Sequence, residues 1–298
     1  MSKVHYHKPA LTYQDQLNQL KGRGLIVRDD AKALHLLAQV SYYRLSGYWY
    51  PLLDDKYNHR FKPGATFETG FRLYCFDREL RKVVMAELEK IEVAIRAHMI
   101  YVLSHRFGPF WFTDPNLFTN TASHSKMMSS LTSEYARSDE QFIKAFRQKY
   151  SDLFPPSWML LEISSFGTLS MLYKNLNTTH EKRQIANFFG LDDQTFGSWL
   201  HCIVYLRNVC AHHSRLWNRV MSIQPRIPRN PRKLWLVNSS VSNNRAYFAL
   251  AMILFLLKTV NPNNRFLEKL NLLFHKYPEI DKSAMGFDVG WNNEPLWQ

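Results

Sequence analysis

Cysteine is scarce in this sequence. The 298 residues contain three, Cys75, Cys202 and Cys210, and no two of them form a C-x-x-C pair. Disulfide-stapled folds and structural zinc sites need more cysteines at short, regular spacings. No HExxH motif, glycine-rich phosphate loop or serine-hydrolase elbow is present either. The sequence therefore predicts a reduced, cytoplasmic protein with no metal and no cofactor.

Long apolar runs are also missing. The N-terminal residues MSKVHYHKPA lack the apolar segment of a signal peptide. The most apolar run, residues 246–257, is too short to cross a bilayer and predicts a buried helix. We therefore expect no membrane partner.

Acidic residues are absent from one long stretch. The net charge is +13, and no Asp or Glu occurs from Gln194 through Leu267, where arginine and lysine recur throughout. Ordinary solvated surfaces mix both signs of charge. This stretch therefore predicts a surface that binds a polyanion such as RNA. A generic basic surface without a function is the alternative.

Apolar residues recur every three or four positions over much of the chain, which predicts an all-α protein. The longest pattern predicts a helix from a cap at Thr66 to about His105. Shorter helices are expected within residues 11–53, 121–150, 158–176, 179–189 and 245–275, and a loop at residues 54–66.

The domain prediction is a helical extension in residues 1–60, packed on a helical domain in residues 61–298. Within the second region, Ser165-Phe166-Gly167 is expected to separate two helices, with Thr168 as a cap. Glu162 lies in an apolar setting and needs a partner, for which an arginine of the Trp199–Arg219 stretch is the natural candidate.

The stretch from Trp199 to Arg219, WLHCIVYLRNVCAHHSRLWNR, contains no Gly or Pro and predicts one continuous helix capped by Asp192 and Asp193. At about 100° per residue it has two distinct sides. The apolar side consists of Cys202, Leu206, Val209, Leu216 and Val220. The polar side, which lacks carboxylates, consists of His201, Tyr205, Asn208, His212, Arg215 and Arg219.

The two adjacent histidines separate on this helical winding. His213 falls on the apolar side, which predicts a buried histidine with a local hydrogen bond. His212 falls on the polar side, one turn after Asn208, and is the better candidate for chemistry.

These residues also carry a family resemblance. The segment Arg207-Asn208-Val209-Cys210-Ala211-His212 resembles the R-x4-H motif of the HEPN superfamily. The longer string RNVCAHHSRLWNR resembles the Abi (abortive infection) family of bacterial phage-resistance proteins, in its AbiD/AbiF-like branch. The blocks VSYYRLSGYW, from Val40, and SWMLLEISSFGTLSMLYKNL, from Ser157, are similar to the same family. The resemblance implies a HEPN-like helical bundle, a ribonuclease that uses Arg207 and His212, and a homodimer in which two motifs face one cleft.

The residue types independently suit cleavage of RNA without a metal. RNA carries its own nucleophile, the 2′-OH. His212 can exchange that proton or protonate the leaving 5′-oxygen. Arg207 offers a planar fork for the phosphate, and Asn208 can hold the imidazole or the phosphate. In an unbroken helix, however, Arg207 lies roughly 140° around the axis from His212. Either the helix distorts, Arg207 reaches around, or a dimer completes the site.

Basic residues after the motif are candidates for binding RNA. Pro225, Pro228 and Pro231 predict an extended arm, which suits tracking a phosphate backbone as well as strapping the bundle. The candidate RNA-binding residues are Arg215, Arg219, Arg226, Arg229, Arg232 and Lys233.

Further residues are candidates for supporting roles. His201 and Tyr205 share the polar side with His212. Glu92 and Arg96, one turn apart, are best interpreted as an ordinary exposed ion pair, with orientation of Arg207 or His212 as the alternative. In the block from Val40 to Trp49, aromatic packing is favoured over direct base stacking.

The favoured hypothesis is a metal-independent endoribonuclease in phage defence or a toxin system. A second hypothesis is an RNA-binding module that is controlled by a structured RNA and does not cleave. A third is nucleotide binding or nucleotidyl transfer. The expected partners are RNA, a second copy of the chain, and a noncoding RNA or antitoxin.

Overall fold

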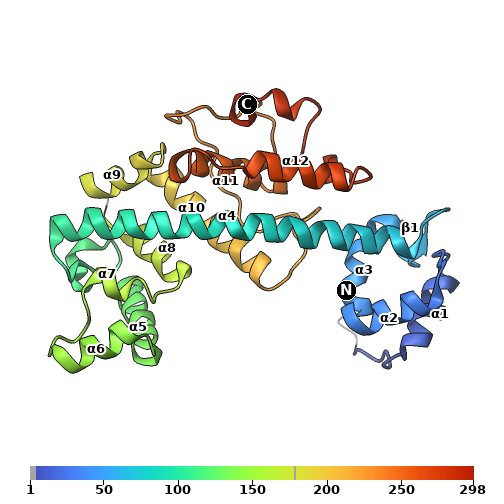
Figure 1. Cartoon of the computed structure of the whole chain (residues 1–298), viewed down its shortest axis with the longest axis horizontal. Helices are drawn as coiled ribbons and strands as arrows, with labels where there is room; N and C mark the ends of the chain where they lie inside the picture. The colour runs from blue at the N-terminus through green and yellow to red at the C-terminus, as the bar shows by residue number, and fades with distance from the viewer. Residues whose placement is uncertain (1–4, 178) are drawn as a thin grey trace. The chain divides into compact units, whose positions relative to one another are not determined.

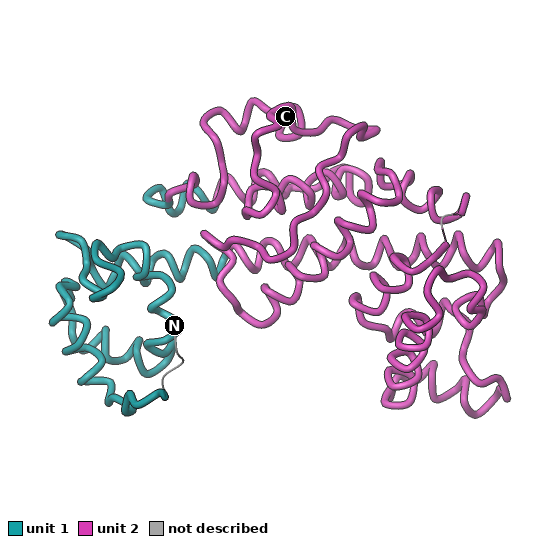
Figure 2. The backbone as a smooth tube through the Cα atoms, turned by 180° about the vertical axis from the view of Figure 1, so that it is seen from behind, with its two compact units in different colours: residues 1–79, 273–280 teal, residues 80–272, 281–298 magenta. Residues whose placement is uncertain are grey.

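The computed structural model describes residues 5–177 and 179–298, and these residues are predominantly helical (Figure 1). The all-α prediction is confirmed: the described residues form twelve α-helices and one small two-stranded hairpin. The chain divides into two compact units, shown in Figure 2. The first unit runs up to Glu79 and includes Leu273–Ile280. The second consists of Leu80–Leu272 and Asp281–Gln298.

Three short helices build the first unit: α1 (Tyr13–Gly22), α2 (Asp30–Val40) and α3 (Tyr42–Trp49). Side chains cap all three: Thr12 accepts a hydrogen bond from the Asp15 amide, Asp29 accepts one from the Lys32 amide, and Ser41 accepts one from the Arg44 amide. Such caps satisfy amide groups that lack a partner inside the helix.

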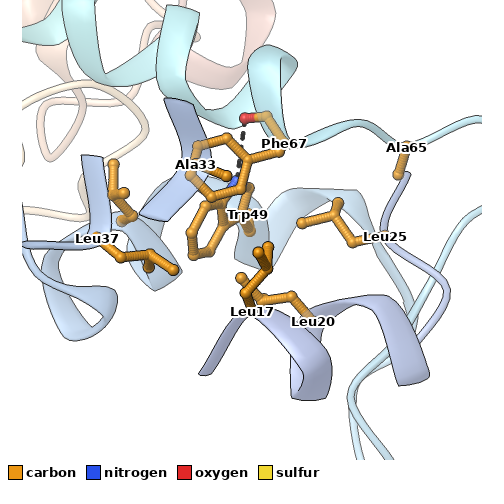
Figure 3. Packing of buried hydrophobic residues seen from close by; sticks show 9 residues of the cluster. Leu17, Leu20, Leu25, Ala33, Leu37, Trp49, Ala65 and Phe67 are labelled. Carbon is orange, nitrogen blue, oxygen red and sulfur yellow. Dashed lines mark hydrogen bonds between the residues drawn. The ribbon is translucent and has the colours of Figure 1, made fainter. Parts of the chain in front are cut away.

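The indole of Trp49 occupies the core of this unit. Figure 3 shows its ring among Leu17, Leu37 and Phe67. The indole Nε1 donates to the carbonyl oxygen of Phe67 at 3.3 Å. Since a buried indole N–H needs an acceptor, this bond allows the ring to be fully enclosed.

A hairpin follows α3, where a loop was expected. Strands β1 (Leu53–Asp55) and β2 (Arg60–Phe61) pair antiparallel. The Asp55 carboxylate accepts from the amides of Tyr57 and Asn58 and so closes the turn. The strands are too short to show an alternating pattern in sequence, which is why the loop prediction missed them.

The long helix is confirmed as α4 (Phe67–Phe107), with the Thr66 hydroxyl accepting from the Thr69 amide at 3.1 Å. The second unit then contains α5 (Thr121–Arg137), α6 (Gln141–Lys149), α7 (Ser157–Leu160), α8 (Phe166–Asn175), α9 (His180–Phe188), α10 (Asp193–Ala211), α11 (Ala246–Val260) and the start of α12 (Phe266–Lys276). Short 3-10 helices occur at Tyr50–Leu52, Trp111–Thr113, Pro115–Leu117, Ser283–Met285, Trp291–Asn293 and Pro295–Trp297.

The apolar helix α11 is confirmed as a core element. All its residues from Ala246 to Leu257 are buried, and it packs against α10. No helix within the described residues is long and apolar enough to span a bilayer. The apolar run thus contributes to the core of the second unit.

Three sequence-based details of this unit are wrong. Residues 121–150 form two helices, α5 and α6. The cap of α8 is Ser165, whose hydroxyl accepts from the Thr168 amide at 3.1 Å, so the cap lies three residues earlier than predicted. The partner of Glu162 is Arg96 of α4, at 3.9 Å. The Glu162 side chain is half-exposed and does not need the buried partner that its apolar neighbours implied.

Candidate active site

Helix α10 begins where the two aspartates predicted. The carboxylate of Asp192 accepts from the amides of Gln194, at 3.0 Å, and Thr195, at 2.8 Å. Asp193 lies in the first turn, where its negative charge interacts favourably with the helix dipole. These contacts fix the start of the helix that carries the motif.

One face of α10 packs against α8, α9 and α11. The three residues of the predicted apolar side that lie within the helix, Cys202, Leu206 and Val209, are all buried. Trp199 is also enclosed, and its indole Nε1 donates to the carbonyl oxygen of Arg226 at 2.8 Å. The buried face therefore holds the opposite, polar face toward solvent.

The motif helix ends at Ala211, eight residues before the predicted end. His212 is its C-cap, and His213 takes a left-handed conformation with φ of 56°. The Ser214 amide donates to the carbonyl of Val209 at 2.9 Å, and the His213 amide donates to that of Cys210 at 3.1 Å. These are the two hydrogen bonds of a Schellman motif.

The early end of the helix overturns two predictions. His213 is exposed, and Val220 is 63% exposed, although both were assigned to the apolar side. Neither residue continues the helical winding on which that assignment depended. Left-handed C′ residues are usually glycine, so a histidine in this position gave no signal in the sequence.

The left-handed backbone at His213 leads to a prediction about stability. We expect His213→Val to lower the free energy of unfolding by about 1–2 kcal/mol, because a β-branched residue is strained at positive φ. His213→Asn should be near neutral, because asparagine tolerates this region. Both variants remove the imidazole, so the difference between their free energies of unfolding reports the effect of the backbone conformation. Equal urea midpoints for the two variants would contradict the assignment.

The three motif residues lie around the end of α10. Asn208 and His212 are exposed, and Arg207 is half-buried. The Nε of Arg207 is buried and has no hydrogen-bond partner among the described residues. An unsatisfied buried donor costs about 1–3 kcal/mol unless a water or a ligand accepts from it. The helix is unbroken through Ala211, and the His212 amide still donates to the carbonyl of Asn208 at 2.9 Å, so the separation of roughly 140° between Arg207 and His212 around the axis remains.

The chain folds back along α10 after the motif. The Arg219 Nε donates to the Tyr205 hydroxyl at 2.8 Å, and its Nη1 donates to the carbonyl of Arg215 at 3.1 Å. Burial alone would raise the pKa of Tyr205, but hydrogen bonds with Ser222 and Arg219 outweigh it and lower the pKa. The structure thus brings Tyr205 and Arg219 of the polar side together, and Arg219 helps to hold this loop.

His201 borders a pocket of about 350 Å³ on the same helix. Partial burial of the ring, and then the charge of Lys174, lower the pKa of His201, so the imidazole is neutral near pH 7. Lys182 lies at the pocket with its ammonium donating to the carbonyl of Leu176 at 2.7 Å. Lys174 and Lys182 were missed from the sequence because they come from α8 and α9, far from the motif in the chain.

The extended arm after the motif combines both roles considered for it. The Arg226 amide donates to the Ser198 hydroxyl at 2.9 Å, and the Arg232 amide donates to the carbonyl of Gly190 at 3.0 Å. The backbone therefore straps the bundle. The side chains of Arg226, Arg229 and Arg232 are nevertheless exposed.

Lys233 differs from these arginines. Its Nζ is buried, lies 5.8 Å from the centre of the Phe255 ring, and has no hydrogen-bond partner among the described residues. Burial lowers the pKa of this ammonium. Direct contact between Lys233 and a polyanion would require the side chain to move outward.

Arg96 is buried, so the exposed ion pair predicted for it is wrong. Its guanidinium donates to Glu92 at 2.7 Å and to the carbonyl of Ser164 at 3.2 Å. These contacts join α4 to the segment between α7 and α8. The orientation of Arg207 or His212 by this pair stays a prediction.

The fold and the site define an all-α protein in which a basic segment without carboxylates presents Asn208 and His212 to solvent. Among the described residues, no three His, Cys, Asp or Glu side chains are grouped so that they could hold a metal ion. The Abi-like protein family matches residues 35–218, more than half of the sequence, and the chain belongs to this family. No curated protein and no solved structure matches the chain.

Proposed function

We propose that this protein is a metal-independent endoribonuclease that acts in bacterial phage defence or as a toxin. Arg207, Asn208 and His212 are the proposed catalytic residues. The observation that carries the proposal is the exposure of His212 at the end of α10, one turn after the exposed Asn208. Membership of the Abi-like protein family supports the role in abortive infection.

The proposed reaction uses the nucleophile that RNA supplies. His212 takes the proton of a 2′-OH, and the leaving 5′-oxygen takes a proton from water or from the His212 of the second copy; the two roles can also be exchanged. The 2′-oxygen forms a bond to phosphorus, and the bond from phosphorus to the 5′-oxygen breaks. Arg207 is proposed to face the charge that develops on the phosphate; its Nε is buried without a partner among the described residues, so the guanidinium would have to turn outward to donate from this atom. No carboxylate occurs in sequence between Gln194 and Leu267 to compete for the guanidinium.

The flanking basic residues are proposed to hold the RNA. Arg226, Arg229 and Arg232 are exposed on a backbone fixed to the bundle, so they offer cations at defined positions. Arg215 and Arg219 lie between the motif and this arm. Contacts of this kind position a phosphate backbone without reading its sequence.

A homodimer forms part of the proposal. Each chain carries one R-x4-H segment, and a two-fold axis near His212 would bring two copies to one cleft. Light scattering should then give twice the mass of one chain. A monomeric mass with nuclease activity intact would contradict the dimeric site.

The direct test is the chemistry of the cut ends. Purified protein incubated with single-stranded RNA in excess EDTA should release fragments with 2′,3′-cyclic phosphate and 5′-hydroxyl ends, because the 2′-OH is the attacking group. Mass spectrometry of the fragments identifies these ends. Fragments with 5′-phosphate ends, or cleavage that EDTA abolishes, would contradict the mechanism.

The exposed arginines of the arm also favour a second function, binding of RNA without cleavage under the control of a structured RNA or an antitoxin. The two functions differ in one assay. In the second, binding weakens steeply with salt because counterions are released, while the RNA keeps its full length at every protein concentration.

A further inference from the structure

The first unit contains a groove of about 740 Å³ that the motif does not explain. It lies among α1, α3, the hairpin and the segment that precedes α1. Three exposed tyrosines line it, Tyr6, Tyr43 and Tyr50. The groove therefore presents aromatic faces to solvent within a single compact unit.

The aromatic block from Val40 to Trp49 divides into two groups. Tyr48 and Trp49 are 2% and 1% exposed, so aromatic packing accounts for them. Tyr43, in the same helix, is 90% exposed and lines the groove. Its ring contributes little to the core, so packing does not explain an aromatic residue there.

Apart from the tyrosines, the ionisable residues of the groove are all basic. Lys8, Arg23 and His59 line it, and its lining contains no Asp or Glu. The Arg23 guanidinium donates to the Tyr42 hydroxyl at 2.8 Å, which fixes a cation beside the rings. Exposed aromatic faces beside fixed cations are the combination with which proteins bind single-stranded nucleic acids.

We propose that this groove binds single-stranded RNA by stacking unpaired bases on Tyr43, with Tyr6 and Tyr50 as further stacking surfaces. The inference builds on the proposed RNA substrate and specifies the form of RNA that is recognised. Charge favours this occupant, because Lys8 and Arg23 pair with phosphates. Duplex RNA keeps its bases stacked on one another and cannot offer their faces to tyrosine.

Binding of a fluorescein-labelled oligouridylate, measured by anisotropy, tests the groove. His212→Ala protein serves as the background, so that no cleavage is needed or observed. Tyr43→Ala should weaken binding about tenfold, as expected when one base loses its aromatic partner. Tyr43→Phe keeps the ring and should bind as the background protein does.

Tyr57→Ala is the matched control. Tyr57 is 92% exposed, lies in the hairpin turn of the same unit, and does not line the groove. We expect this variant to bind as tightly as the background protein. We also expect Tyr43→Ala to leave the affinity for a duplex RNA of equal length unchanged.

The outcomes separate this inference from the nuclease proposal. Unchanged binding by Tyr43→Ala overturns the groove whether or not the wild type cleaves RNA. Full binding by Tyr43→Leu also overturns it, because an apolar contact without a stacking face would then suffice. Loss of binding in Tyr43→Ala supports the groove even if the wild type proves unable to cut RNA.

Discussion

His212→Ala is expected to slow RNA cleavage by about 10²–10⁴-fold while the fold remains intact. The magnitude is the typical contribution of a positioned general acid or base. The fold should survive because His212 is exposed at the helix cap, where its backbone amide bonds to Asn208. Product formation in EDTA measures the rate of cleavage, and the circular dichroism spectrum shows whether the fold is retained.

The adjacent histidine provides the control. His213 is also exposed, and His213→Asn removes an imidazole one residue away while suiting the left-handed backbone. We expect His213→Asn to cleave at close to the wild-type rate. Cleavage by His212→Ala at the wild-type rate would end the enzyme proposal. An equal loss in both variants would indicate that the shape of the helix end matters, and no single imidazole would then be the catalyst.

The start of the motif helix was more predictable than its end. Asp192 and Thr66 correctly predicted the starts of α10 and α4, because a capping side chain is a local signal in the sequence. The end of α10 depends on a histidine at positive φ, which propensity disfavours. Leu216 and Trp217, which follow the end of α10, are buried. Burial of this kind is a tertiary effect that no local pattern records.

Parts of the candidate site were equally beyond the sequence. Lys174 and Lys182 reach the His201 pocket from α8 and α9, and only folding brings them there. The burial of Lys233 against Phe255 likewise depends on a contact between residues distant in sequence. The exposure of Asn208 and His212, by contrast, followed from their place opposite the apolar residues of α10. The periodicity of the sequence therefore predicted which residues of α10 face solvent, but it could not predict which residues of other helices lie beside them.

Gly70→Ala should destabilise the first unit, although its helical position suggests the reverse. Alanine is favoured over glycine inside a helix by about 1 kcal/mol. A Cβ at residue 70, however, would lie 2.0 Å from Cδ1 and 2.3 Å from Nε1 of Trp49. That indole is buried and bonded to the carbonyl of Phe67, so it has little room to move. Overpacking of about 1–3 kcal/mol or more should outweigh the helical gain.

Gly22→Ala separates the steric cost from helix propensity. Gly22 is the last residue of α1, and a Cβ there would meet no atom within 4 Å. We expect Gly22→Ala to be neutral or slightly stabilising and Gly70→Ala to lower the urea midpoint followed by tryptophan fluorescence. Trp49→Leu should cost stability alone but make Gly70→Ala nearly harmless, because the clashing ring is gone and the two effects are coupled. Additive losses in the double variant would show that the contact between Gly70 and Trp49 does not limit the packing of this core.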